Sequence, residues 1–192
     1  MRWRAHPLNP DIPAGGILLK EIIKTPPDRI RKMEERLHRA AAEAELSFCG
    51  PEKVYNTRMA QELGAWAATE GRGDEFHHAV YAAYFGEGKD ISNQKVLCDL
   101  AESVGLSPDK AMRCMGTRGF ESFVDADWQF SKQMDIMVIP TYLVNGNRLV
   151  GVQSYKRLSR FLENNGVEKR GERTEGTEAS RRRDKLRHRG TK

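Results

Sequence analysis

The chain has 192 residues, enough for one domain or for one domain with an insertion, and 31% of them are charged. No uncharged apolar run approaches the roughly 18 residues of a membrane-spanning helix, and residues 1–7 lack the apolar core of a signal peptide. We therefore expect no membrane-spanning helix and no membrane partner, and we expect a cytoplasmic protein.

The net charge of +5 comes from one end of the chain. Residues 167–192 hold 10 Lys/Arg and 5 Asp/Glu, whereas residues 1–166 hold 22 of each kind. This tail has almost no apolar side chains to bury, so we expect it to be disordered and solvated. Weak binding to RNA or to an acidic surface is the alternative, and we expect no other nucleic-acid contact.

The first 135 residues predict mostly helices. Trp3 and Ala5 alternate with polar residues, which predicts a short strand that ends at Pro7, before a proline-rich loop. Apolar residues then recur at helical spacing between capping and terminating residues. The expected helices cover residues 26–45, 57–70, 74–86, 92–105 (with Ser92 as N-cap), 107 onward and 117–134.

A β-hairpin follows the helices. Two short β-rich runs, Thr141–Val144 and Arg148–Val150, flank Asn145-Gly146. Asn and Gly tolerate positive φ, so this pair between two β-rich runs strongly predicts a hairpin turn. Pro140 opens the first strand, which the apolar residues around it predict to be buried on both faces. Ser154 is a plausible N-cap for a final amphipathic helix that ends at Gly166.

Cysteine and histidine usage indicates neither a redox motif nor a metal site. Cys49, Cys98 and Cys114 are too few for a disulfide framework, and no two of them have the Cys-x-x-Cys spacing. Adjacent His77 and His78 point about 100° apart on a helix and cannot share a metal as an i, i+4 pair can. We expect no metal and no cofactor, and a reducing compartment.

Two sequence motifs resemble the C-terminal half of the DsbA family of thioredoxin-fold proteins, closest to its FrnE-like branch. The motifs are Val-Ile-Pro-Thr-Tyr-Leu-Val-Asn-Gly, which starts at Val138, and the later Leu-Val-Gly-Val-Gln-Ser-Tyr. Segments 56–60, 76–79 and 124–128 resemble it too. The resemblance implies an α/β thioredoxin-like fold, formed by residues 1–24 and 117–166, with an all-helical insertion at 25–116. It also implies a cis-proline at Pro140.

The same resemblance implies substrate docking by Val138, Ile139, Pro140 and Thr141. In the family the catalytic Cys-x-x-Cys lies on a helix before the strand that matches Trp3, and this sequence has no such motif. We therefore assign no catalytic residue, and we expect that the true protein starts earlier than Met1 and that its first strand and helix are missing from this sequence. The resulting gap in the sheet would be about 10 Å wide.

Three functions stay open at this point. The first is a thiol–disulfide oxidoreductase or disulfide isomerase that acts on a protein or a small thiol, of which this chain is the docking half. The second is an enzyme similar to kappa-class glutathione transferases or 2-hydroxychromene-2-carboxylate isomerases, which would bind glutathione. The third is a redox-inactive interaction module, such as a homodimer that pairs through its open sheet.

Overall fold

The computed structural model describes residues 2–13 and 15–168, so the predicted disorder of the tail lies almost wholly outside the described residues. The chain forms two compact units, Met1–Asp135 and Ile136–Lys192. Across the described residues, each helix is too short or too polar to traverse a lipid bilayer.

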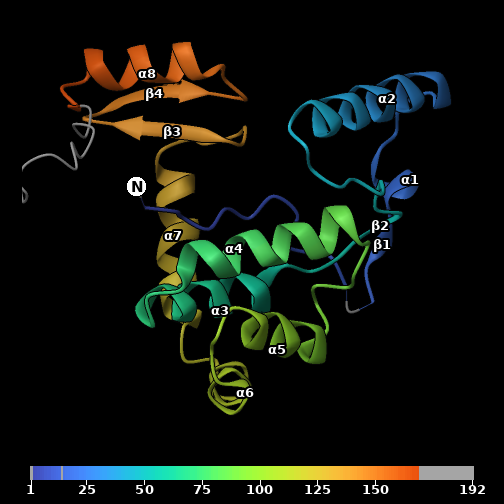
Figure 1. Cartoon of the computed structure of the whole chain (residues 1–192), viewed down its shortest axis with the longest axis vertical. Helices are drawn as coiled ribbons and strands as arrows, with labels where there is room; N and C mark the ends of the chain where they lie inside the picture. Colours follow the sequence, from blue (N-terminus) through green and yellow to red (C-terminus); the bar gives the residue numbers. More distant parts are fainter. Residues whose placement is uncertain (1, 14, 169–192) are drawn as a thin grey trace, which may run out of the picture. The chain divides into compact units, whose positions relative to one another are not determined.

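The first unit is built mainly from helices (Figure 1). Its two short strands, β1 and β2, pair antiparallel and were not predicted. The helical order confirms the prediction from periodicity. The elements are β1 (Ile17–Leu18), α1 (Leu19–Ile22), α2 (Pro27–Glu43), β2 (Lys53–Val54), α3 (Arg58–Thr69), α4 (Gly73–Tyr81), the π-helical turn η1 (Ala82–Gly86), α5 (Gln94–Ser103), α6 (Pro108–Thr117) and α7 (Glu121–Gln133).

The core of this unit lies among α3 to α7, where the apolar faces of the helices meet. Leu63, Phe76, Leu97 and Val124 are fully buried. Cys98 is also buried, whereas Cys114 is half-buried. Burial of these helical stripes removes apolar surface from water and supplies most of the stabilisation of a unit of this kind.

Two helix boundaries differ from the prediction. The N-cap of α5 is Asn93 and not Ser92: the Asn93 side chain accepts a hydrogen bond from Lys95 N at 2.8 Å, whereas Ser92 donates its hydroxyl to Asp90. The helix expected from residue 117 starts at 121 because Arg118, with φ of 51°, adopts a left-handed conformation that ends α6.

The predicted strand at Trp3 is wrong, since residues 2–7 form no strand. A side chain takes the place of a neighbouring strand: Ala5 N donates to Asp127 Oδ2 at 3.0 Å, and Arg4 Nη1 binds Asp127 Oδ1 at 2.6 Å. The Trp3 ring stacks on His77 with ring centres 4.5 Å apart. The segment is therefore fixed by α4 and α7 without a sheet hydrogen-bond ladder.

The second unit holds the predicted hairpin and the final helix. Strand β3 (Thr141–Val144) pairs antiparallel with β4 (Asn147–Val150), and helix α8 (Tyr155–Asn164) lies along one face of the hairpin (Figure 1). Asn145 and Gly146 both have positive φ, as their turn requires. Ser154 caps α8 as predicted, because its hydroxyl accepts from Arg157 N.

The prediction that β3 is buried on both faces is wrong. All four of its residues are only half-buried, and no residue from 136 to 168 reaches the buried class. The physical reason is the size of the sheet: within the described residues β3 has one neighbouring strand, and two strands with one helix cannot enclose a side chain completely.

Candidate functional site

The segment before β3 exposes three consecutive apolar side chains. Met137 is 77% exposed, Val138 51% and Ile139 45%. The Ile139–Pro140 peptide bond is cis, and the Thr141 hydroxyl donates a hydrogen bond to the Val138 carbonyl. Of the four residues predicted to dock substrate, Val138 and Ile139 are thus exposed before β3, whereas Pro140 and Thr141 are half-buried.

The register of the hairpin determines which backbone groups of β3 remain free. Pro140 O accepts a hydrogen bond from Gly151 N at 2.7 Å, and Tyr142 lies opposite Leu149. Antiparallel pairs alternate between hydrogen-bonded and non-hydrogen-bonded, so Thr141 and Leu143 direct their N–H and C=O groups away from β4. Strand β3 pairs with β4 alone in the described part of the chain.

These outward backbone groups of Thr141 and Leu143 define the outer edge of β3. A row of N–H and C=O groups of this kind is a template for an additional extended strand. Neither Thr141 nor Leu143 carries a charge that would oppose such pairing. The sequence prediction included Thr141 but missed Leu143, although the phase of the Asn-Gly turn, two residues beyond it, was a signal that could have identified it.

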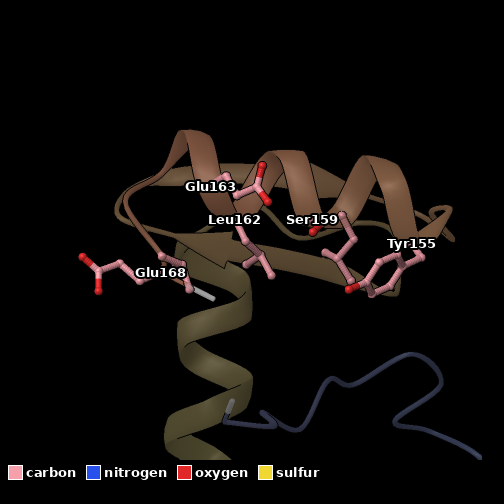
Figure 2. Close-up of a pocket in the computed structure, with 7 residues that line it drawn as sticks. Tyr155, Ser159, Leu162, Glu163 and Glu168 are labelled. Carbon is pink, nitrogen blue, oxygen red and sulfur yellow. The ribbon is translucent and has the colours of Figure 1, made fainter. Parts of the chain in front are cut away.

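A shallow cavity of about 250 Å³ lies beside α8 and the residues that follow it (Figure 2). Leu158, Leu162 and Val167 give it an apolar surface, and Tyr155 at its rim is 84% exposed. Polar groups contribute at its margin, and the lining residues are Tyr155, Leu158, Ser159, Leu162, Glu163, Val167 and Glu168. The cavity is therefore a second uncovered apolar surface of this unit, besides the exposed residues Val138 and Ile139.

The three thiols do not form a redox pair. All are free, and only Cys49 is exposed. Burial raises the pKa of the Cys98 thiol, with a smaller contribution from Asp99, and burial next to Glu62 raises the pKa of Cys114. A raised pKa keeps a thiol protonated at neutral pH, so Cys98 and Cys114 are poor nucleophiles.

Of the adjacent histidines, His77 packs within the first unit, whereas His78 is exposed. His77 lies between the Trp3 and Tyr81 rings, and burial lowers its pKa, which keeps it neutral at pH 7. Within residues 2–13 and 15–168, no group of three or more His, Cys, Asp or Glu side chains is placed to hold a metal ion.

Residues 1–163 match the family of DsbA-like thioredoxin domains. The chain belongs to this family. The match runs through the outer edge of β3 and most of α8, so the hairpin and the helix are the C-terminal part of a DsbA-like thioredoxin fold. The predicted α/β thioredoxin-like fold with helical additions is thereby confirmed.

Solved structures share this fold. A DsbA oxidoreductase candidate from Streptomyces coelicolor superposes with a TM-score of 0.76 over 85% of this chain and 74% of its own, at 18% identity. A protein disulfide isomerase candidate from Nitrosomonas europaea gives 0.59 over 73% and 74%, at 14% identity. A 2-hydroxychromene-2-carboxylate isomerase gives 0.64 over 96% and 83%, at 15% identity.

Among curated proteins, YwbO of Bacillus subtilis strain 168, a protein without an assigned function, is 27% identical over 126 residues. The matched part is 64% of this DsbA-like chain but only 59% of YwbO. The chain therefore spans about three-fifths of the length of this relative.

Proposed function

We propose that this DsbA-like chain is the substrate-docking part of a FrnE-like thiol–disulfide oxidoreductase or disulfide isomerase. The observation that supports the proposal is the outer edge of β3, approached by the exposed residues Val138 and Ile139. An extended substrate would align there through main-chain hydrogen bonds, while its side chains contact the apolar approach. The substrate would be a protein or a small thiol.

The exchange needs a Cys-x-x-Cys pair that the 192 residues do not contain. We propose that a strand and helix carrying this pair complete the domain, with the strand on the outer edge of β3. The first thiolate attacks a substrate disulfide, which forms a mixed disulfide and releases one substrate thiolate. The second thiol then displaces the other substrate sulfur, leaving the substrate reduced and the cysteine pair oxidised.

We also propose the domain division and location that the sequence suggested. Residues 1–24 and 117–166 would form the thioredoxin-like part around a helical insertion at 25–116, and the match over residues 1–163 spans all three segments. Free Cys49, Cys98 and Cys114 are compatible with the reducing cytoplasm.

Insulin reduction with dithiothreitol as reductant tests this proposal. The chain itself is expected to show only the background rate. Joined at its N-terminus to a strand–helix segment carrying Cys-x-x-Cys, it is expected to reduce insulin, because the added strand pairs with β3 and the helix N-terminus lowers the thiol pKa. The matched control carries Ser-x-x-Ser in the same segment.

Equal rates for the two joined chains would overturn the proposal, provided that circular dichroism shows both to be folded. The redox-inactive module would be favoured if the chain forms a stable dimer through β3 and the added segment does not pair with it. Size-exclusion chromatography with light scattering distinguishes these cases.

A glutathione-dependent enzyme is the second candidate. The observation in its favour is the structural match to 2-hydroxychromene-2-carboxylate isomerase, which covers 96% of this chain. In that case the completing helix would carry a lone serine, and glutathione would take the place of the protein substrate at Val138 and Ile139. Isomerisation of 2-hydroxychromene-2-carboxylate by the serine-bearing joined chain, dependent on glutathione, would support it.

A further inference from the structure

Apolar side chains gather at the end of the hairpin that lies opposite its turn. There, Pro140 O accepts a hydrogen bond from Gly151 N at 2.7 Å. Ile139 precedes this bonded pair and Val152 follows it, so both lie at that end of the hairpin. Helix α8 begins at the same end, with Tyr155 as its first residue (Figure 1). The predicted docking segment before β3 and the start of α8 thus share one end of the second unit.

Val152 and Tyr155 are the most exposed large apolar side chains of the described residues, at 89% and 84%. Neither therefore contributes much to packing within the second unit. A single exposed apolar residue is common on a protein surface and needs no explanation. Here, however, the two share one end of the hairpin with Met137, Val138 and Ile139, which are exposed as well. Such a group of apolar side chains is typical of a surface that binds a partner.

Local hydrogen bonds order the connection that carries Val152. Gly151 has φ of 80°, a left-handed conformation that turns the chain out of β4 at low steric cost. The Gln153 side chain donates Nε2 to Val150 O at 2.6 Å across this turn, and Ser154 caps the helix that follows. An ordered binding surface loses less conformational entropy when a partner binds. The connection therefore presents Val152 at little entropic cost.

We propose that Val152 and Tyr155 determine substrate specificity by contacting apolar side chains that flank the reacting cysteine of a protein substrate. This inference rests on the proposed function, because it adds the two residues to the surface that Val138 and Ile139 provide before β3. A small thiol has no flanking side chains and cannot use this surface. An extended peptide advances about 3.3 Å per residue, so neighbours of its cysteine reach past Ile139. The substrate class is therefore a disulfide in an extended segment with apolar neighbours.

Reduction of two synthetic disulfide peptides by the joined Cys-x-x-Cys chain tests this inference. Leucines flank the cysteine in one peptide, and serines replace them in the other, with length and charge unchanged. The joined chain is expected to reduce the leucine peptide with a kcat/KM about tenfold higher, because the leucine side chains leave water on binding. Val152→Ser is expected to lower this value about threefold and Val152→Ser/Tyr155→Ser about tenfold, chiefly through a higher KM. The serine peptide should be reduced equally by all of these chains.

The matched control is Val167→Ser, the same substitution beyond the other end of α8, whose 10 residues span about 15 Å. Val167 is 41% exposed, and its replacement is expected to leave the rates for both peptides unchanged. An unaltered leucine preference in Val152→Ser/Tyr155→Ser, an equal fall for both peptides or an equal loss in the control would overturn the inference. If the unsubstituted joined chain reduces neither peptide, the proposed function itself is overturned, and the inference with it.

Discussion

Replacement of Glu62 by Gln is expected to lower the free energy of unfolding by about 3 kcal/mol at pH 7. Glu62, on α3, is 2% exposed and links α3 to Arg118 at the C-terminal end of α6. Its carboxylate binds Arg58 Nε at 2.6 Å, and Arg118 binds it through Nη2 at 2.6 Å and Nε at 2.8 Å. An amide cannot balance the two guanidinium charges, which would remain paired only with groups at the surface.

The same substitution is expected to change the response to acid. Burial raises the pKa of Glu62, but hydrogen bonds and charge from Arg118 and Arg58 lower it more, so the net pKa lies below its usual 4.5. A group with a depressed folded pKa stabilises the protein above its unfolded pKa, and this contribution is lost as the pH falls through the folded value. Below pH 4.5 the stabilities of wild type and variant should therefore converge.

Urea denaturation between pH 3 and 7 measures both effects. The control is Asp99→Asn, which breaks the exposed pair of Asp99 with Lys95 Nζ at 2.9 Å on α5. This change is expected to cost less than about 1 kcal/mol, because water and salt screen an exposed pair. Equal losses of unfolding free energy for Glu62→Gln and Asp99→Asn would show that the buried ion pairs of Glu62 stabilise the protein no more than an exposed pair does.

Proline at Leu143 is expected to reduce insulin reduction by the joined Cys-x-x-Cys chain up to about 100-fold. Leu143 directs its N–H away from β4, so proline removes a donor from the outer edge of β3 and leaves the hairpin ladder in place. A carbonyl of the added strand would then be left buried without a donor, which costs up to about 3 kcal/mol. This cost corresponds to a factor of up to about 100 in the docking equilibrium. The effect should appear in activity and much less in hairpin content.

The control for this variant is proline at Val150. Val150 also points its N–H outward, but from β4, on the opposite edge of the hairpin. Proline at Val150 removes one outward N–H, as proline at Leu143 does, but from the other edge. The insulin-reducing activity of the Val150 variant should therefore stay within a few-fold of that of the unsubstituted joined chain. A comparable loss of activity in the Leu143 and Val150 variants would indicate damage to the hairpin. It would contradict the proposal that the outer edge of β3 docks a strand.

Local signals in the sequence predicted the hairpin and the helices well. Asn145-Gly146 determines the turn, and Ser154 caps α8 through a bond only three residues away. Such features depend on residues close together in the sequence, so they can be predicted without knowledge of the fold. The docking role of Val138, Ile139, Pro140 and Thr141 was predicted from resemblance to the family and stays a prediction, and the structure shows Val138 and Ile139 to be exposed.

Features that depend on residues far apart in the sequence could not be predicted from the sequence. The Glu62 cluster joins residues 56 positions apart, because Arg118 reaches it from the end of α6. The predicted strand at Trp3 failed because alternation cannot show whether a neighbouring strand or a side chain, here Asp127, satisfies the backbone. Leu143 was missed because a hydrophobic pattern indicates the faces of a strand, whereas docking depends on its edges.

Amide hydrogen exchange at Thr141 and Leu143 tests the central claim most directly, that the outer edge of β3 is a docking edge. In the chain alone both amides should exchange rapidly, and joining the Cys-x-x-Cys strand–helix segment should slow them at least tenfold, with Arg148 and Val150 unchanged. Slow exchange at Thr141 and Leu143 already in the chain alone, or no change on joining the segment, would contradict the account.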